Sequence, residues 1–285
     1  MVVCNFSDVY KFQPFMDGLK RSGETRWLDL SQVPGTDCYC DDEAVETIRR
    51  RIADAGITDA RGIHFFDNGN FHYMSKIWTD MVQEPFSLVV FDHHPDMQEP
   101  RFGNILSCGG WVKKVLKENK FIDNVVIIGV ADHLADEIKS EIASQPADAA
   151  STMLSTSRND NGAESNDKIT FIRESELPAV TLEGRSPDRV HSTFHIPHSS
   201  HLYLSIDKDV LFPAYAATNW DQGSLDVATL KKIIAGLAAS NRIIGVDICG
   251  ERARDFAGDE YHTVQEADDL NDRINRELVE FLQNF

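Results

Sequence analysis

The sequence predicts an α/β fold in which a mostly parallel sheet is covered by helices on both faces, as in a doubly wound sheet. Two observations predict it. Several short runs of residues are continuously apolar, which is typical of strands that are buried on both faces. Segments with apolar residues at helical spacing lie between these runs, and this strand–helix alternation favours parallel pairing. Ligands of such sheets bind at the carboxyl ends of the strands.

Six apolar runs predict strands: Gly62–Phe66, Phe86–Phe91, Asn124–Val130, Lys168–Ile172, His201–Ile206 and Arg242–Ile248. Four segments predict helices: Asp42–Ala55, Trp111–Glu118, Leu225–Ala239 and Glu266–Leu282. The first helix has Asp42 as a candidate cap and keeps Val45, Ile48 and Ile52 at helical spacing. Residues 144–167 are rich in Ala, Ser, Asn and Asp and lack an apolar period. We interpret them as a mobile surface insertion in a single domain of residues 1–285, because strands resume directly after them.

Composition and charge narrow the class of protein. The 285 residues are 42% hydrophobic and 26% charged, which is typical of a soluble globular protein. The net charge of −18 argues against nucleic acid and against anionic membranes as partners. Five cysteines without Cys-x-x-Cys spacing favour a reducing compartment. No apolar run approaches the roughly 20 residues that span a bilayer, and no basic segment followed by an apolar core begins the chain. We therefore expect a cytoplasmic protein.

The first chemical feature follows the strand Phe86–Phe91, where the chain continues as Asp92-His93-His94-Pro95-Asp96. Side chains at the end of a buried strand reach the ligand-binding crevice of an α/β sheet. Carboxylates and imidazoles together suit Mn²⁺, Zn²⁺ or Fe²⁺. The alternative is a polar turn that Pro95 shapes and whose carboxylates cap backbone amides.

A second acidic strand end favours the metal interpretation. The strand His201–Ile206 is followed by Asp207-Lys208-Asp209. Without a cation, two carboxylates buried close together carry a considerable electrostatic cost. Two such strand ends in one chain therefore predict a pair of divalent ions between them.

These segments resemble those of the arginase–agmatinase–formimidoylglutamase group, the ureohydrolases. The family patterns are Asp-Ala-His-x-Asp and Ser-x-Asp-x-Asp-x-x-x-Pro, and the second is matched here from Ser205 to Pro213. The family's Gly-Gly-Asp-His segment is matched by Gly69-Asn70-Phe71-His72, in which Phe stands in place of Asp. The chain is thus identified as a divergent member, because the match is specific in these segments and faint elsewhere.

The resemblance implies an arginase–deacetylase-like fold, with three α/β/α layers around a central, mostly parallel sheet of about eight strands. It also implies two divalent ions, with Mn²⁺ preferred and zinc, iron or nickel as alternatives. The implied ligands are His72, Asp92, His94, Asp96, Asp207 and Asp209. His93 stands where the family has a small residue, and could support the ligands. Family members commonly form homo-oligomers, which we also expect here.

The resemblance weakens around the substrate. The glutamate that grips the guanidinium in arginases aligns with Gly250, so Glu251 and Asp247 are the nearest candidates. The family's histidine shuttle has no counterpart, because Ser107 or Cys108 occupies its region. We expect Asp96 and Glu251 to be catalytic, with Asp96 taking a proton. The residues expected to bind substrate are Asn104, Trp220, Asp247 and Glu251.

The expected function is hydrolysis of a non-peptide C–N bond in a small guanidino, amidino or formimino compound by metal-activated hydroxide. The alternatives are an amide deacetylase-like metal hydrolase and a non-catalytic metal-binding member of the family. Two further patterns stay open. The histidines 191, 195, 198 and 201 are interpreted as a loop rather than a metal site, and Cys38 and Cys40 give weak support for metal or redox chemistry.

Overall fold

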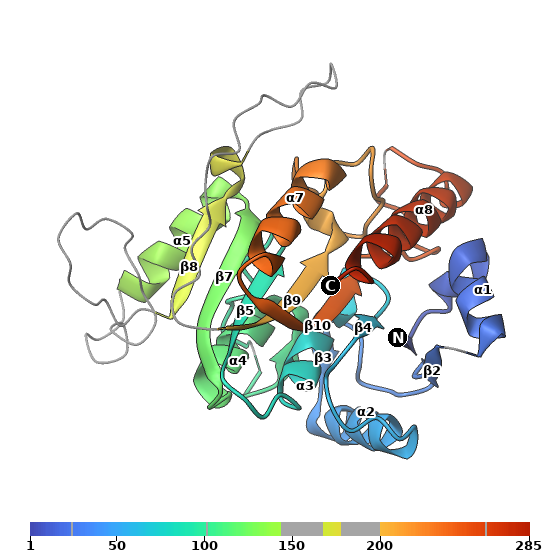
Figure 1. The fold of residues 1–285 in the computed structure, drawn as a ribbon, viewed down its shortest axis with the longest axis horizontal. Helices are drawn as coiled ribbons and strands as arrows, with labels where there is room; N and C mark the ends of the chain where they lie inside the picture. The colour runs from blue at the N-terminus through green and yellow to red at the C-terminus, as the bar shows by residue number, and fades with distance from the viewer. Residues whose placement is uncertain (24, 101, 144–167, 178–199, 260) are drawn as a thin grey trace.

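The computed structural model describes residues 1–23, 25–100, 102–143, 168–177, 200–259 and 261–285. Within them, an eight-stranded sheet runs through the molecule in the order β2-β1-β4-β10-β9-β5-β7-β8, and the neighbouring strands pair in parallel (Figure 1). Its strands are β1 (Val2–Asn5), β2 (Arg26–Asp29), β4 (Ile63–Phe65), β5 (Phe86–Phe91), β7 (Ile122–Val130), β8 (Ile169–Arg173), β9 (His201–Asp207) and β10 (Arg242–Cys249). A separate antiparallel pair joins β3 (Tyr39–Cys40) to β6 (Leu106–Ser107).

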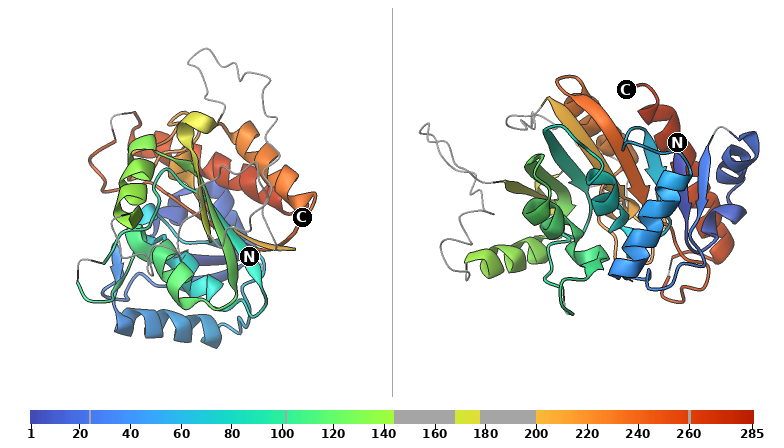
Figure 2. Two further views of the ribbon diagram at one scale, coloured as in Figure 1. Left: turned by 90° about the vertical axis from the view of Figure 1, so that its left-hand side faces the viewer. Right: turned by 90° about the horizontal axis from the view of Figure 1, so that it is seen from below.

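The sheet is covered on both faces, because alternate residues of each strand point to opposite sides. In β5, Leu88 and Val90 belong to one hydrophobic cluster, whereas Val89 and Phe91 belong to the other. The first cluster holds side chains of α2 (Asp42–Asp54), α3 (Met74–Thr79), α4 (Trp111–Glu118) and α5 (Asp132–Ala143). The second holds those of α1 (Pro14–Ser22), α7 (Val227–Ala238) and α8 (Val264–Leu282). Figure 2 shows α2 and α4 on one side of the sheet and α7 and α8 on the other.

The predicted fold class is confirmed: a central parallel sheet lies between two layers of helices. The six predicted strands and four predicted helices all form, and capping side chains fix where three of these helices begin. In α2 the cap is Asp41, whose side chain accepts the backbone N–H of Ala44, rather than the expected Asp42. The side chain of Asp226 accepts the backbone N–H of Thr229, so α7 begins after Asp226 rather than at Leu225. Thr263 and Glu266 form a reciprocal capping box, so α8 begins earlier than predicted.

Short 3₁₀ helices complete the framework. They are η1 (Val9–Phe12), η2 (Gly69–Phe71), η3 (Cys108–Gly110), η4 (Glu174–Glu176) and η5 (Lys208–Val210). Two of them matter for the site, because η2 comes after β4 and η5 directly follows β9. The predicted insertion 144–167 and histidines 191, 195 and 198 lie outside the described residues, while His201 begins β9. Of the helices that the structure describes, none is long and apolar enough to span a membrane.

Candidate metal centre

The carboxyl ends of four neighbouring strands, β4, β10, β9 and β5, meet at one edge of the sheet. Each contributes to a cluster of polar side chains there. All six predicted ligands lie in this cluster, and five of them are almost completely buried: His72, Asp92, Asp96, Asp207 and Asp209. His94 is partly buried. Since these residues come from chain positions far apart, the parallel sheet is what brings them together.

One group forms around His72. Its Nδ1 lies 3.1 Å from Asp92 Oδ2, 3.0 Å from Asp96 Oδ2 and 3.5 Å from Asp207 Oδ2. The other ring nitrogen, Nε2, is 2.8 Å from Ser205 Oγ on β9. This contact fixes the ring so that Nδ1 faces the carboxylates, as a histidine ligand of a metal requires. Asp96 reaches back to His72 because its backbone is left-handed, with φ 48°, a conformation that aspartate tolerates.

The second group forms around His94. Its Nδ1 lies 2.9 Å from Asp209 Oδ2 and 3.5 Å from Asp92 Oδ1, and its Nε2 lies 3.0 Å from Asp221 Oδ1. The backbone N–H of His94 also donates to Asp92 Oδ1 at 2.6 Å. Asp92 therefore belongs to both groups and presents one carboxylate oxygen to each. Asp221 was not predicted as a site residue, and it orients the second histidine as Ser205 orients the first.

Burial and mutual repulsion dominate the electrostatics of this cluster. Burial, with the charge of Asp92, raises the pKa of both Asp96 and Asp209 to about 7. Burial, with the charge of Asp209, raises the pKa of Asp207 to about 7. The pKa of His94 is raised by the Asp209 carboxylate against the opposing effect of burial. The repulsion within this carboxylate-rich cluster thus favours binding of protons or of other cations. Divalent cations would take the place of those protons, and the imidazole and carboxylate donors fit manganese, iron or zinc.

Trp111 supports the group around His72. Its indole Nε1 donates to Asp96 Oδ2 at 2.6 Å, and its ring lies 4.9 Å from the His72 ring. Trp111 begins α4, whose next residue, Val112, donates its backbone N–H to the carbonyl of Asp96. The helix start and the acidic loop are therefore fixed to each other. The sequence shows Trp111 as the first residue of a predicted helix, but nothing in it indicates this partner.

Cys249 is a further residue of the cluster that was not predicted. It ends β10, and its Sγ lies 3.2 Å from Asp207 Oδ2. Ligand atoms of His72, Asp207 and Cys249 lie within 4.8 Å of one another, as do those of the His72–Asp92–Asp96 and Asp92–His94–Asp209 groups. The position of Cys249 directly after the predicted strand Arg242–Ile248 was the signal available in the sequence.

A cavity of about 850 Å³ opens over these groups. The six predicted ligands line its floor. Trp220, 39% exposed, lies at the cavity with its ring 5.6 Å from that of His94, and its Nε1 donates to Asn70 Oδ1. Other lining residues include Cys38, Gln98, Cys108, Leu134 and Glu137. Of the four residues expected to bind substrate, the structure brings Trp220 to this cavity.

The other three expected substrate residues are not among the described residues that line the cavity. Asn104 lies on an exposed loop, where its carbonyl accepts from Lys114. Asp247 is fully buried and is bonded to His64 Nδ1 at 2.9 Å and to the Tyr203 hydroxyl at 2.8 Å.

Glu251 lies in a buried ion pair with Lys208 rather than in the cavity. It also accepts from Gln13 at 2.7 Å and from Asn275 at 2.7 Å. The reason lies in Gly250, whose φ of 89° turns the chain at the end of β10 and carries Glu251 into the protein interior. The geometry therefore separates Glu251 from the groups around His72 and His94.

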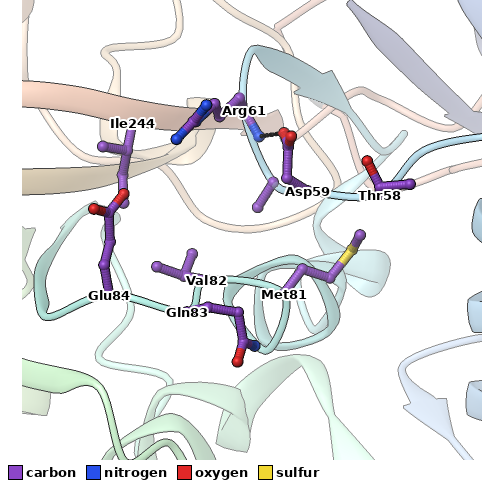
Figure 3. Close-up of a pocket in the computed structure, with 9 residues that line it drawn as sticks. Thr58, Asp59, Arg61, Met81, Val82, Gln83, Glu84 and Ile244 are labelled. Carbon is purple, nitrogen blue, oxygen red and sulfur yellow. Dashed lines mark hydrogen bonds between the residues drawn. The ribbon is translucent and has the colours of Figure 1, made fainter.

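A smaller cavity of about 340 Å³ lies at the opposite edge of the sheet (Figure 3). The loops before β4 and β5 form it, and its lining residues include Thr58, Arg61, Met81, Glu84 and Ile244. Figure 3 shows the backbone of Arg61 bonded to the side chain of Asp59. The ligand groups and the larger cavity share the carboxyl edge, where ligands of parallel sheets bind.

Solved structures of the ureohydrolases have the same fold. Bacillus subtilis arginase matches 98% of this chain over 97% of its own, with a TM-score of 0.59 and 12% identity. The agmatine ureohydrolase of Thermoplasma volcanium matches 99% of this chain over 88% of its own, with a TM-score of 0.55 and 14% identity. A T. brucei arginase-like protein mutant bound with Mn²⁺ matches 98% of this chain over 90% of its own, with a TM-score of 0.53 and 15% identity. The chain therefore has the arginase-like α/β fold.

Sequence comparison adds one relative. No family model matches the chain. An uncharacterized protein of Thermotoga maritima is 27% identical over 190 residues, which make up 67% of this chain. The match spans 58% of the length of that curated relative.

Proposed function

We propose that the chain is a divergent ureohydrolase that uses two divalent metal ions to hydrolyse a non-peptide C–N bond. Its substrate would be a small guanidino, amidino or formimino compound. The observation that carries the proposal is the pair of histidine–carboxylate groups sharing Asp92, on the floor of a cavity in an arginase-like fold. Proteins with this fold include an agmatine ureohydrolase and a proclavaminate amidino hydrolase, and the second name states hydrolysis at an amidino group.

The proposed ligands divide between two positions. His72, Asp92, Asp96 and Asp207 would hold one ion, because three carboxylate oxygens face His72 Nδ1. Asp92, His94 and Asp209 would hold the other. Manganese is the first candidate, since a triple mutant of an arginase-like protein with this fold has been solved bound with Mn²⁺. Zinc, iron and nickel are the alternatives.

The chemistry that two such ions supply is a water molecule of lowered pKa, able to attack a trigonal carbon near neutral pH. Asp96 is the proposed acceptor of the proton, because its carboxylate lines the cavity and Trp111 holds one of its oxygens. Trp220 offers a flat apolar surface beside His94 for the substrate. Glu251 takes no part in this proposal, because its carboxylate is bound to Lys208 in the interior.

Metal analysis and a substrate screen test the proposal. Purified protein reconstituted with Mn²⁺ should hold two ions per chain and release urea, ammonia or formamide from one member of a panel. The panel is arginine, agmatine, guanidinobutyrate, formiminoglutamate and related amidines. Asp92→Asn should lose both metal and turnover, because Asp92 serves both groups. A protein that neither retains a transition metal nor is stabilised by one would overturn the proposal.

A non-catalytic metal-binding protein is the second candidate. The placement of Glu251 in the interior favours it, and Ser107 and Cys108 stand where the family has a histidine. Two bound ions without turnover of any panel member would support this candidate. A single bound ion with turnover of an acetylated amine would instead indicate the deacetylase-like alternative.

A further inference from the structure

Cys249 stands opposite one of the proposed ligands. In the parallel register of β10 and β9, Cys249 is the partner of Asp207. Its side chain is 1% exposed, and its thiol donates to Asp207 Oδ2. That same oxygen faces His72 Nδ1 at 3.5 Å. The sulfur therefore approaches the space enclosed by His72 and its carboxylates.

The alternative is that Cys249 is a small apolar residue that fills the core, the usual role of a buried cysteine. Its surroundings argue otherwise. Among the cysteines of the described ranges, Cys249 belongs to a group of potential ligand atoms, with His72 and Asp207. Cys4 and Cys40 are equally buried but belong to no such group. The thiol of Cys249 thus lies where a ligand would, and not merely where an apolar side chain fits.

The turn after β10 holds this arrangement in place. A Cβ atom at Gly250 would lie 2.3 Å from Asp207 Oδ1 and 2.7 Å from the backbone nitrogen of Lys208. The strand end is thus packed directly against Asp207. Asp207 Oδ1 accepts the backbone N–H of Asp209, which leaves Oδ2 for His72 and Cys249.

We propose that Cys249 is a thiolate ligand of the ion bound beside His72, and that this position selects zinc or iron(II) over manganese. The inference rests on the proposed metal centre. Thiolate sulfur binds zinc and iron(II) strongly, whereas manganese is suited to carboxylate and water oxygens. On coordination, the sulfur gives an electron pair to the ion and its proton passes to solvent, with no change of oxidation state. The position beside His94 has only nitrogen and oxygen donors, so no sulfur there adds to the general preference of protein sites for zinc over manganese.

Cobalt(II) reports on sulfur ligation in the full chain. Protein reconstituted with Co²⁺ should show a near-ultraviolet thiolate-to-cobalt charge-transfer band. Cys249→Ser should remove this band while the bound cobalt and its visible bands remain. The matched control is the Cys38→Ser/Cys108→Ser double variant, which removes two thiols that line the same cavity and should keep the band. Retention of the band in Cys249→Ser would overturn the proposal.

Metal competition tests the selectivity. In an equimolar mixture of Zn²⁺ and Mn²⁺, Cys249→Ser should shift the bound ratio toward manganese by at least about tenfold, the scale on which even partners outside the coordination sphere change metal affinity. An unchanged ratio would overturn the claim of selection.

The wild-type protein gives a test that depends on no variant. X-ray absorption of the zinc-loaded protein should show a sulfur neighbour at about 2.3 Å. Bound zinc with nitrogen and oxygen neighbours alone would overturn the role of Cys249 and leave the metal centre intact. Failure to bind cobalt, zinc or manganese at all would instead overturn the proposed function.

Discussion

The side chain of Trp111 holds Asp96 in place through a single indole hydrogen bond, so a substitution can isolate what that bond contributes to metal binding and stability. Trp111→Phe keeps an aromatic ring and removes the donor. We expect metal affinity to fall by about tenfold, because partners that orient a ligand contribute on that scale. Unfolding free energy should fall by about 1–3 kcal/mol, since Asp96 loses a buried partner. Chelator competition and urea unfolding measure the two effects.

Trp78 provides the matched control for that variant. It is fully buried like Trp111, but its indole Nε1 has no hydrogen-bond partner among the residues that the structure describes. Trp78→Phe should therefore leave metal affinity unchanged. An equal loss of affinity in both variants would show that ring volume, rather than the bond to Asp96, is what matters.

The raised pKa values of the clustered carboxyl groups predict an unusual dependence of stability on pH for protein stripped of metal. The pKa of Asp96, Asp207 and Asp209 is raised to about 7, so folding favours their protonated forms. This stabilisation is present below their unfolded pKa of about 4 and is lost as pH rises through about 7. The pKa values of His72 and His94 are also raised, so the protein loses further stability as pH rises above about 6.5.

We therefore expect the melting temperature of chelator-treated protein to fall between about pH 5 and about pH 8. The pKa of Asp92 is lowered, so its ionised form stabilises the fold, and this stabilisation is lost only as pH falls below about 4. Metal competes with protons, so the rise in melting temperature on adding Mn²⁺ should be larger at the higher pH. Differential scanning calorimetry measures both. A metal-induced rise that shrinks with increasing pH would contradict the competition between metal and protons.

Single residues were predictable from the sequence where chemistry and strand ends coincide. Asp92, His94, Asp96, Asp207 and Asp209 come together because they lie at or just after the ends of β5 and β9. His72 follows η2 rather than a strand, and the family resemblance is what indicated it. The supporting contacts were not predictable, since Trp111 and Asp221 approach their partners through tertiary packing. Glu251 was expected at the substrate but lies in the interior, because the positive φ at Gly250 turns the chain there. That turn is a property of the fold and cannot be read from the sequence.

At the scale of elements, the backbone turn and the close packing at the end of β10 require a glycine at position 250. Gly250→Ala would place a methyl group against Asp207 Oδ1 and a side chain at φ 89°. We expect a destabilisation of about 1–3 kcal/mol from the backbone conformation and a marked loss of metal affinity as Asp207 is displaced. Isothermal titration and denaturant unfolding test these outcomes.

Gly236 offers the control for this substitution. It lies within α7, and a Cβ atom there would meet nothing within 4 Å. Gly236→Ala should raise the free energy of unfolding by about 1 kcal/mol through helix propensity and leave metal affinity unchanged. If Gly250→Ala also kept full metal affinity, the packing of β10 against Asp207 would not position that ligand.

Elements with continuous apolar sequence were predicted, and shorter or more polar ones were not. β1 has four residues, and β2 has exposed Arg26 and Asp29 at its ends. Neither offers an apolar run of recognisable length. α5 is rich in acidic residues. It buries few side chains, such as those of Ala135 and Ile138, so its sequence shows little apolar periodicity.

At the scale of the whole molecule, the pair of Lys208 and Glu251 joins four parts of the chain. It connects η5 to the turn after β10, while Gln13 and Asn275 bring in the residue before α1 and helix α8. Lys208→Met leaves the carboxylate buried and unpaired, so the free energy of unfolding should fall by about 3–5 kcal/mol. Chemical denaturation of the metal-free protein measures this.

The Lys208→Met/Glu251→Gln double variant removes both charges and should recover much of that stability. Glu251→Gln alone should retain its metal at low temperature, because Glu251 lies outside the ligand groups. A folded, metal-loaded Glu251→Gln variant without turnover would contradict that placement and give Glu251 a role in the reaction.

The layered architecture could be predicted as a class, but the order of its strands could not. Continuous apolar runs separated by helices predict a parallel sheet with two covered faces. They do not show that β10, near the end of the chain, lies between β4 and β9. This insertion brings Cys249 beside Asp207, so the strand order itself decides which residues meet at the cluster.

Asp92 presents one oxygen to each histidine, so in the proposed metal centre the occupancies of the two positions would depend on each other. The first ion to bind would neutralise a carboxylate that the second also needs, and the second would be held more weakly. By thermodynamic reciprocity, an ion at either position would weaken binding at the other by the same factor. Calorimetric titration should therefore resolve two steps. At limiting metal, most molecules would carry a single ion, and the fully loaded centre would form only when the free metal concentration passes a second threshold.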